Sequence, residues 1–246
     1  MKRALIIFAL AGMLGIASAY VMLRSPVVAP LVSDAQLVPM GAGYALLASI
    51  TADAPAELEQ ITVEGASQTT LAGATGPTFI PENTSAALAM DGAHAMVMGL
   101  DAEEGALRTV TFAFRDMPAV TTRARVTEQS TMDHTLSYPV PEGEPKPSLE
   151  VSLEQINARW HVALKTTDFE FSHDLVDAPH RPGVGHGHVY LNGLKLGRVF
   201  GPVFEFGALP AGRYSLLVVL NTNDHRAYEV NGALVQAEAD LVVQAE

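Results

Sequence analysis

Short runs of alternating or β-branched apolar residues, separated by Gly, Pro, Asn and Asp, fill this chain from residue 33 onward. Alternation with a period of two places every second side chain on one face, which is typical of a half-buried strand rather than a helix. Helical periodicity is scarce over the same stretch, so we expect an all-β fold. The first set of runs predicts a small β-sandwich whose strands fall at 44–50, 59–64, 86–90, 95–100, 108–114 and 121–126.

The composition changes between residues 128 and 149, where prolines recur at positions 139, 141, 145 and 147. Proline has no backbone N–H and cannot donate to a strand ladder. We therefore expect residues 128–149 to form an extended linker that does not pair in a sheet. This linker would separate a first domain at 33–127 from a second domain at 150–246.

The second domain also has the pattern of a small β-sandwich. Asn192-Gly193 joins two apolar runs, and this dipeptide favours a tight hairpin because both of its residues tolerate a positive φ. The runs predict strands at 160–165, 188–191, 194–200, 214–220 and 234–243.

Charge and cysteine content exclude several classes of function. Lys and Arg number 15 against 27 Asp and Glu, a net charge of -12 with no basic block, which excludes a nucleic-acid partner. The absence of cysteine excludes disulfides, cysteine-ligated zinc, iron–sulfur clusters and thiol catalysis.

The N-terminus has the pattern of an export signal. Two basic residues precede an uncharged run at 4–23, and Ala17-Ser18-Ala19 fits a signal-peptidase site that would leave Tyr20 first. The run is also just long enough to remain as an uncleaved membrane anchor, and a buried N-terminal helix is the third interpretation. We expect residues 1–23 to be a signal peptide or a membrane anchor. The remainder of the chain is then expected in the periplasm, either released or anchored to the inner membrane by this segment.

Histidines are concentrated in the second domain, and their spacing indicates a metal site. His186 and His188 are two residues apart on a predicted strand, so both side chains point to one face and can bind one ion. If neighbouring strands run antiparallel, the loop that carries His225 reaches the same end of the sheet. His180 and His173 are further candidates on nearby loops. Imidazole suits copper and zinc among other metals.

Other interpretations of these histidines differ in function class. They can be solvated loop residues of a scaffold or adhesion protein, or ligands in a metal-dependent enzyme. A serine hydrolase is disfavoured because no Gly-x-Ser-x-Gly motif occurs. A copper–zinc superoxide dismutase is disfavoured because the cysteine pair is absent.

A second candidate site lies in the first domain. His94 and Met96 are also two apart on a predicted strand, and a thioether is a soft ligand that prefers Cu(I). Met98 and Met90 are reserve ligands. The alternative is that these methionines only fill the core.

The stretch from Ile80-Pro81 through 94–100 (HAMVMGL), followed by the run at 108–114, resembles the periplasmic copper chaperones of the PCu(A)C family. The resemblance covers about residues 34–126. It implies a cupredoxin-like β-sandwich that binds Cu(I) through two His and two Met and delivers it to periplasmic oxidases.

Only half of that ligand set is present here. His94 and Met96 match the family motif, whereas residues 61–78, where the other His and Met are expected, contain neither. Met132 and His134 in the linker are candidate replacements.

The second domain resembles, more loosely, His-rich β domains of exported proteins that are associated with periplasmic copper handling. The matching residues are Gly185 to Gly193 and Asn221 to His225. Those domains often place a histidine near position 205, where this chain has Glu205. Glu205 is either an oxygen ligand for the metal or a position at which the metal ligand has been lost.

Together these patterns predict a non-enzymatic, exported copper-binding protein of two β-sandwich domains, a chaperone or buffer. The expected metal is copper, as Cu(I) or Cu(II), with zinc as the alternative, and the main site lies in the second domain. The expected partner is a copper-receiving periplasmic or membrane protein. Membrane contact is expected only if the N-terminal segment is uncleaved.

Overall fold

The computed structural model describes residues 28–128 and 136–244. Over these ranges the chain forms strands, turns and loops and no helix, which confirms the predicted all-β class. A membrane-spanning apolar helix is therefore not found in the described part of the chain. The predicted signal or anchor at 1–23, together with Met132 and His134, lies outside the described residues.

The first half of the chain (residues 28–128) contains every strand predicted for it and three that were not, namely β1, β4 and β5. Its strands are β1 (Leu31–Met40), β2 (Gly43–Ala52), β3 (Ala56–Val63), β4 (Gln68–Ala72), β5 (Thr78–Ile80), β6 (Thr84–Leu88), β7 (His94–Met98), β8 (Leu107–Phe114) and β9 (Val120–Val126). β2 pairs with β1, β6 and β7, while β3 pairs with β5 and β8. β9 joins the two groups because it pairs with both β8 and β1.

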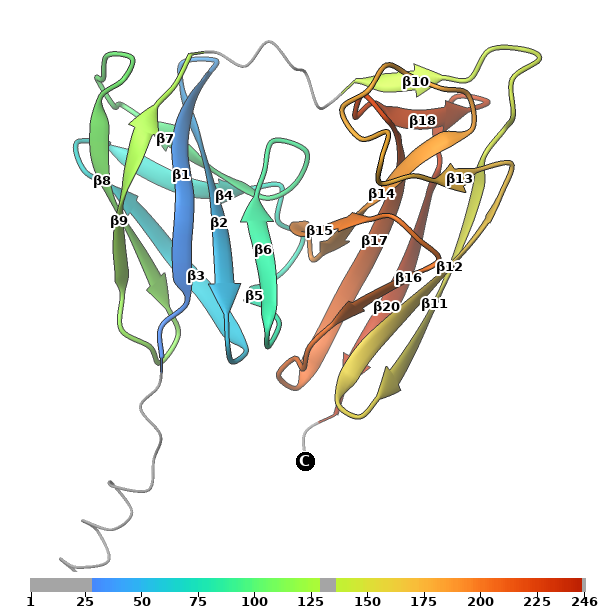
Figure 1. Ribbon diagram of the computed structural model, residues 1–246. Helices are drawn as coiled ribbons and strands as arrows, with labels where there is room; N and C mark the ends of the chain where they lie inside the picture. The colour runs from blue at the N-terminus through green and yellow to red at the C-terminus, as the bar shows by residue number, and fades with distance from the viewer. Residues whose placement is uncertain (1–27, 129–135, 245–246) are drawn as a thin grey trace, which may run out of the picture.

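The second half (residues 136–244) is built around β14 and β17 (Figure 1). Its strands are β10 (Ser137–Pro139), β11 (Ser148–Ile156), β12 (Arg159–Thr167), β13 (Glu170–Phe171), β14 (Val184–Leu191), β15 (Leu194–Val199), β16 (Val203–Phe206), β17 (Gly212–Thr222), β18 (Ala227–Val230), β19 (Ala233–Leu234) and β20 (Gln236–Val243). β14 lies between β15 and β17, antiparallel to both, and β20 pairs with β17.

A second sheet of β11, β12 and β16 covers one face of this sheet. Its inward side chains Trp160, Val162 and Phe206 belong to the same buried core as Leu191 and Leu216 of the facing sheet. The period-two pattern at Trp160 to Leu164 thus marks the inner face correctly. The predicted hairpin at Asn192-Gly193 is also present, and both residues have the positive φ that the turn needs, +47° and +84°.

The expectation that the proline-rich stretch cannot pair was wrong for β10. Ser137–Pro139 lies parallel to β18, with Pro139 opposite Glu229. The main-chain bonds involve the residues on either side: Val140 N donates to Glu229 O and Ala227 N donates to Leu136 O. Proline is tolerated because β10 is an edge strand and the ladder does not require a donor at position 139.

The two halves contact each other through main-chain hydrogen bonds. Ala93 N donates to Gly193 O at 2.8 Å, and Thr75 N donates to Asn192 O at 3.0 Å. The turn at Gly193 approaches the first half so closely that a Cβ there would lie 2.2 Å from Gly73 O. Beside this contact, β6 of the first half pairs with β15 of the second, with Ala87 opposite Lys195 (Figure 1).

Candidate metal centre

Three of the predicted ligands meet in the structure. His186 and His188 project from β14 and His225 from the turn after β17, and one ring nitrogen from each lies within 4.8 Å of the others. The Nε2 atoms of His186 and His188 are 3.0 Å apart. The three side chains are only 0%, 2% and 5% exposed, respectively. They therefore form one buried cluster, which we call the three-histidine centre.

The alternation of histidine and glycine explains how β14 carries this cluster. All eight residues of β14 are buried, and its two histidines share one face because they are two apart. A Cβ at Gly187 would lie 2.6 Å from Val199 Cγ1, and one at Gly185 would lie 1.9 Å from Asn221 O. Glycine at these positions lets neighbouring chain segments pack closely against the strand.

His225 reaches the centre through the antiparallel pairing of β14 and β17. His186 lies opposite Asn221 in this ladder, so the turn that follows β17 lies beside the histidines. His225 has a φ of +67°, and its backbone is held by a bond from its N to Thr222 O and one from Asn221 Nδ2 to its carbonyl. The Asp177 carboxylate contacts His225 Nε2 at 2.5 Å. Uncommon backbone conformations of this kind are often found at functional sites.

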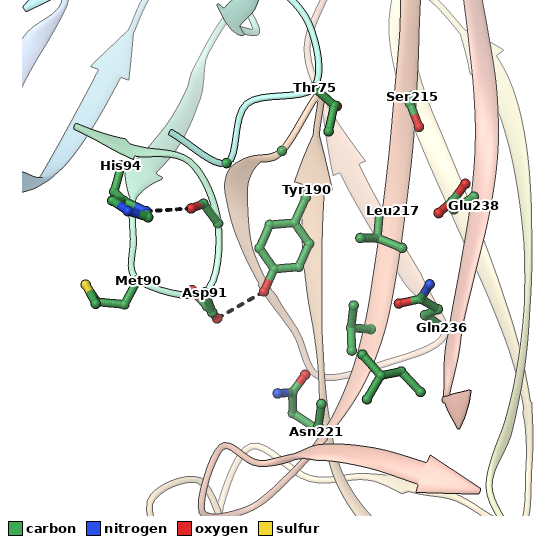
Figure 2. Close-up of a pocket in the computed structure, with 16 residues that line it drawn as sticks. Thr75, Met90, Asp91, His94, Tyr190, Ser215, Leu217, Asn221, Gln236 and Glu238 are labelled. Atoms are coloured by element: carbon green, nitrogen blue, oxygen red, sulfur yellow. Dashed lines mark hydrogen bonds between the residues drawn. The ribbon is translucent and has the colours of Figure 1, made fainter. Parts of the chain in front are cut away.

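A carboxylate from the other half of the chain contacts His188. Asp91 Oδ2, in the β6–β7 loop, lies 2.8 Å from His188 Nδ1, 3.0 Å from the Tyr190 hydroxyl and 2.6 Å from Lys195 Nζ. Figure 2 shows the Tyr190 hydroxyl directed at Asp91 across the contact between the halves. One carboxylate oxygen thus faces three groups of the second half.

Burial, hydrogen bonding and neighbouring charges together determine the charge of these groups at neutral pH. Burial lowers the pKa of His186 to about 2 and that of His188 to about 4, although the hydrogen bond with Asp91 partly opposes the shift at His188. Burial alone would raise the pKa of Asp91, but hydrogen bonding to His188 and the charge of Lys195 lower it overall. Both imidazoles are therefore neutral and Asp91 is ionised, and neutral imidazole is the form that binds metals.

The geometry of the pair suits a single ion. The two Nε2 atoms are 3.0 Å apart. If each were bonded to one metal ion at about 2.0 Å, the N–metal–N angle would be about 97°, which lies between the square-planar and tetrahedral angles. His186 Nδ1 is buried and has no hydrogen-bond partner among the described residues. A set of three imidazoles fits copper or zinc.

The structure does not bring His180 and His173 into the centre. The His180 ring packs on Tyr138, with centroids 4.1 Å apart, and its Nε2 lies 3.7 Å from Glu144. The side chain of His173 is 75% exposed, and its ring edge contacts Phe200. The strands on either side of the loop that carries both histidines, β13 and β14, pair in parallel.

His94 and Met96 lie on β7 of the first half, apart from the three-histidine centre. His94 is buried, and its Nδ1 donates to Gly92 O at 3.0 Å (Figure 2). His94 and Met90 both line a cavity of about 520 Å³ between the halves. On the neighbouring strand β4, Ala72 lies opposite His94 and Thr70 opposite Met96, so that strand supplies no ligand here.

Two carboxylates, Glu205 and Asp224, contact side chains other than the three histidines. Glu205, on β16 of the covering sheet, contacts His161 and Arg159. Asp224 accepts hydrogen bonds from Thr222 and Arg226.

Sequence reasoning missed the groups around the histidines. Tyr190 continues the two-residue spacing of His186 and His188, so the same periodicity would have placed it beside them. No local signal in the sequence connects Asp91 with β14.

Comparison with known proteins provides no identification. No protein-family model matches the chain, and no curated protein matches its sequence. Among solved structures, the copper-bound PCuAC domain from PmoF2 is 18% identical and covers 42% of this chain and 97% of its own, with a TM-score of 0.37. The CupB2 chaperone of Pseudomonas aeruginosa is 11% identical, with coverages of 87% and 100% and a TM-score of 0.25. Titin domains A168–A170 are 7% identical, with coverages of 88% and 89% and a TM-score of 0.23.

Proposed function

We propose that this chain is an exported copper-binding protein that acts as a copper chaperone or buffer. Its main metal site is the three-histidine centre. The observation that carries the proposal is the burial of three histidines around one point, with two Nε2 atoms 3.0 Å apart. One bound cation would be a shared ligand partner for a ring nitrogen of each of the three histidines.

Copper is favoured over zinc by the second His-containing motif. His94 and Met96 keep half of the ligand pattern of the PCu(A)C chaperones, and a thioether is a soft ligand suited to Cu(I). A chain with both an imidazole set and a His/Met pair therefore fits copper handling better than structural zinc binding.

Release of the metal requires access to the ligands. A cleft of about 190 Å³ adjoins the centre, and both His188 and His225 line it together with Met90. Three protein ligands leave at least one coordination position for an incoming group. This arrangement supports transfer by ligand exchange to a copper-receiving periplasmic or membrane protein, with no reaction catalysed.

Metal analysis tests the proposal directly. The full chain, exported to the periplasm of copper-supplemented cells, should be purified with about one copper ion per chain. The double variant His186→Ala/His188→Ala should lose it. The matched control, His161→Ala, removes a histidine from the covering sheet and should keep the metal. Equal copper in the double variant, or zinc in place of copper in every sample, would contradict the proposal.

A further inference from the structure

The β6–β7 loop of the first half is held rigidly against the second half. Ala89 N donates to Ala93 O and Gly92 N donates to Ala89 O, which closes the loop into a turn with Asp91 near its tip. A Cβ at Gly92 would lie 2.9 Å from Gly193 O, so the two chain segments are in close contact. The carboxylate of Asp91 is therefore delivered to a fixed place beside β14.

At that place the carboxylate determines which nitrogen of His188 carries the proton. His188 Nδ1 lies 2.8 Å from Asp91 Oδ2, 3.1 Å from Lys195 Nζ and 3.2 Å from the Tyr190 hydroxyl. Lys195 Nζ only donates, but its shorter contact, 2.6 Å, is with the same carboxylate oxygen. The carboxylate only accepts and is the group nearest to Nδ1, so it favours the proton on His188 Nδ1. The lone pair is then on Nε2, the atom that lies 3.0 Å from His186 Nε2. Asp91 thus both orients the ring and prepares the nitrogen that faces the centre.

We infer that Asp91 is the positioning residue for His188, so that the metal centre of the second half is complete only when the first half is docked. This inference rests on the proposed function. Carboxylates that accept the second N–H of a metal-binding histidine fix its orientation and increase its basicity. Here the carboxylate and the ligand belong to different halves of the chain, so docking of the halves and metal affinity are linked.

A purely structural role is the competing explanation. Asp91 also contacts Lys195 Nζ at 2.6 Å, and such a buried ion pair can serve only to hold the halves together. That role predicts a loss of stability without any change in the metal's environment. The two roles therefore predict different effects of Asp91 substitutions on the affinity and the spectrum of a bound metal ion.

The test compares Cu(II) binding by the full chain with that of Asp91→Asn, Asp91→Glu and the control Asp53→Asn, an exposed carboxylate in the same half. Calorimetric competition titrations give affinity, and electron paramagnetic resonance gives the nitrogen coupling of the bound ion. Asp91→Asn should weaken binding about 10- to 100-fold and alter the spectrum. Asp91→Glu should recover part of both, and Asp53→Asn should match the wild type.

Failure of the inference is separable from failure of the proposed function. If the wild type does not bind Cu(II) through His186 and His188, the proposed function is wrong. If it does, and Asp91→Asn loses thermal stability but keeps the wild-type affinity and spectrum, only the positioning role is wrong. A second measurement uses the metal-free wild-type protein and no Asp91 variant. Nitrogen NMR, with the His188 signals assigned by comparison with His188→Gln, should show His188 as the Nδ1–H tautomer. The Nε2–H tautomer would overturn the inference.

Discussion

The Nε2 atoms of His186 and His188 lie 3.0 Å apart in a region where neither side chain is more than 2% exposed. At this separation at most one of the two nitrogens carries a hydrogen, and neither is in contact with bulk water. The metal-free pair therefore depends on neutral imidazoles, which has a measurable consequence for stability.

The metal-free protein should lose stability as the pH falls. In the unfolded chain both imidazoles have an ordinary pKa near 6.5, whereas burial lowers the pKa to about 2 for His186 and about 4 for His188 in the fold. Below about pH 6.5 the unfolded chain takes up protons that the folded chain excludes, so the free energy of unfolding decreases towards pH 4. Urea unfolding of the chelator-treated protein at several pH values measures this.

The double variant His186→Ala/His188→Ala should lose most of that dependence, because both depressed groups are gone. The exposed His173→Ala should retain it. If the free energy of unfolding of the double variant depended on pH as steeply as that of the wild type, other groups would be the cause of the acid sensitivity.

Bound metal should stabilise the fold. Zn²⁺, chosen because it does not undergo redox reactions, should increase the free energy of unfolding by about 2.7 kcal/mol at 100 times its dissociation constant. Thermal unfolding at increasing Zn²⁺ concentration measures the effect. In His186→Ala/His188→Ala the melting temperature should not respond to Zn²⁺, and an equal response would place the bound ion elsewhere.

Gly187→Ala should destabilise the protein by about 1–3 kcal/mol, the usual cost of overpacking a core. A Cβ at this position would lie 2.6 Å from Val199 Cγ1, inside the sheet. Gly201→Ala is the matched control, because a Cβ there has no atom within 4 Å. Urea unfolding of both variants at neutral pH tests the difference, and equal stabilities would mean that β15 adjusts without cost.

The sequence predicted those parts of the centre that depend on local periodicity. The two-residue spacing places His186 and His188 on one face wherever that strand lies, and His225 required only that β14 and β17 be antiparallel. Asp91 was not predictable, because its contact with His188 arises from docking of the two halves, which no local pattern encodes. The linker prediction failed at Pro139 because a ladder tolerates proline where no donor is needed.

Two substitutions on β4 should convert the incomplete site on β7 into a Cu(I) site. On β4, Ala72 lies opposite His94 and Thr70 opposite Met96. Directly opposed residues of an antiparallel pair have Cβ atoms about 4.5–5.5 Å apart on the same face. Ala72→His with Thr70→Met therefore brings two imidazoles and two thioethers together, a set suited to Cu(I).

The experiment uses the His186→Ala/His188→Ala background, so that only the β7 site is measured. Competition with a chromogenic Cu(I) chelator should give weak binding before the two β4 substitutions and markedly tighter binding after them. The control Leu71→His with Thr69→Met places the same side chains on the opposite face, beside Ala95 and Val97, and should give no gain. Equal gains from both pairs would mean that facing His94 and Met96 is irrelevant. Tight binding before any β4 substitution would mean that His94 and Met96 already have other ligands, with Met90 the first candidate because it lines the same cavity as His94.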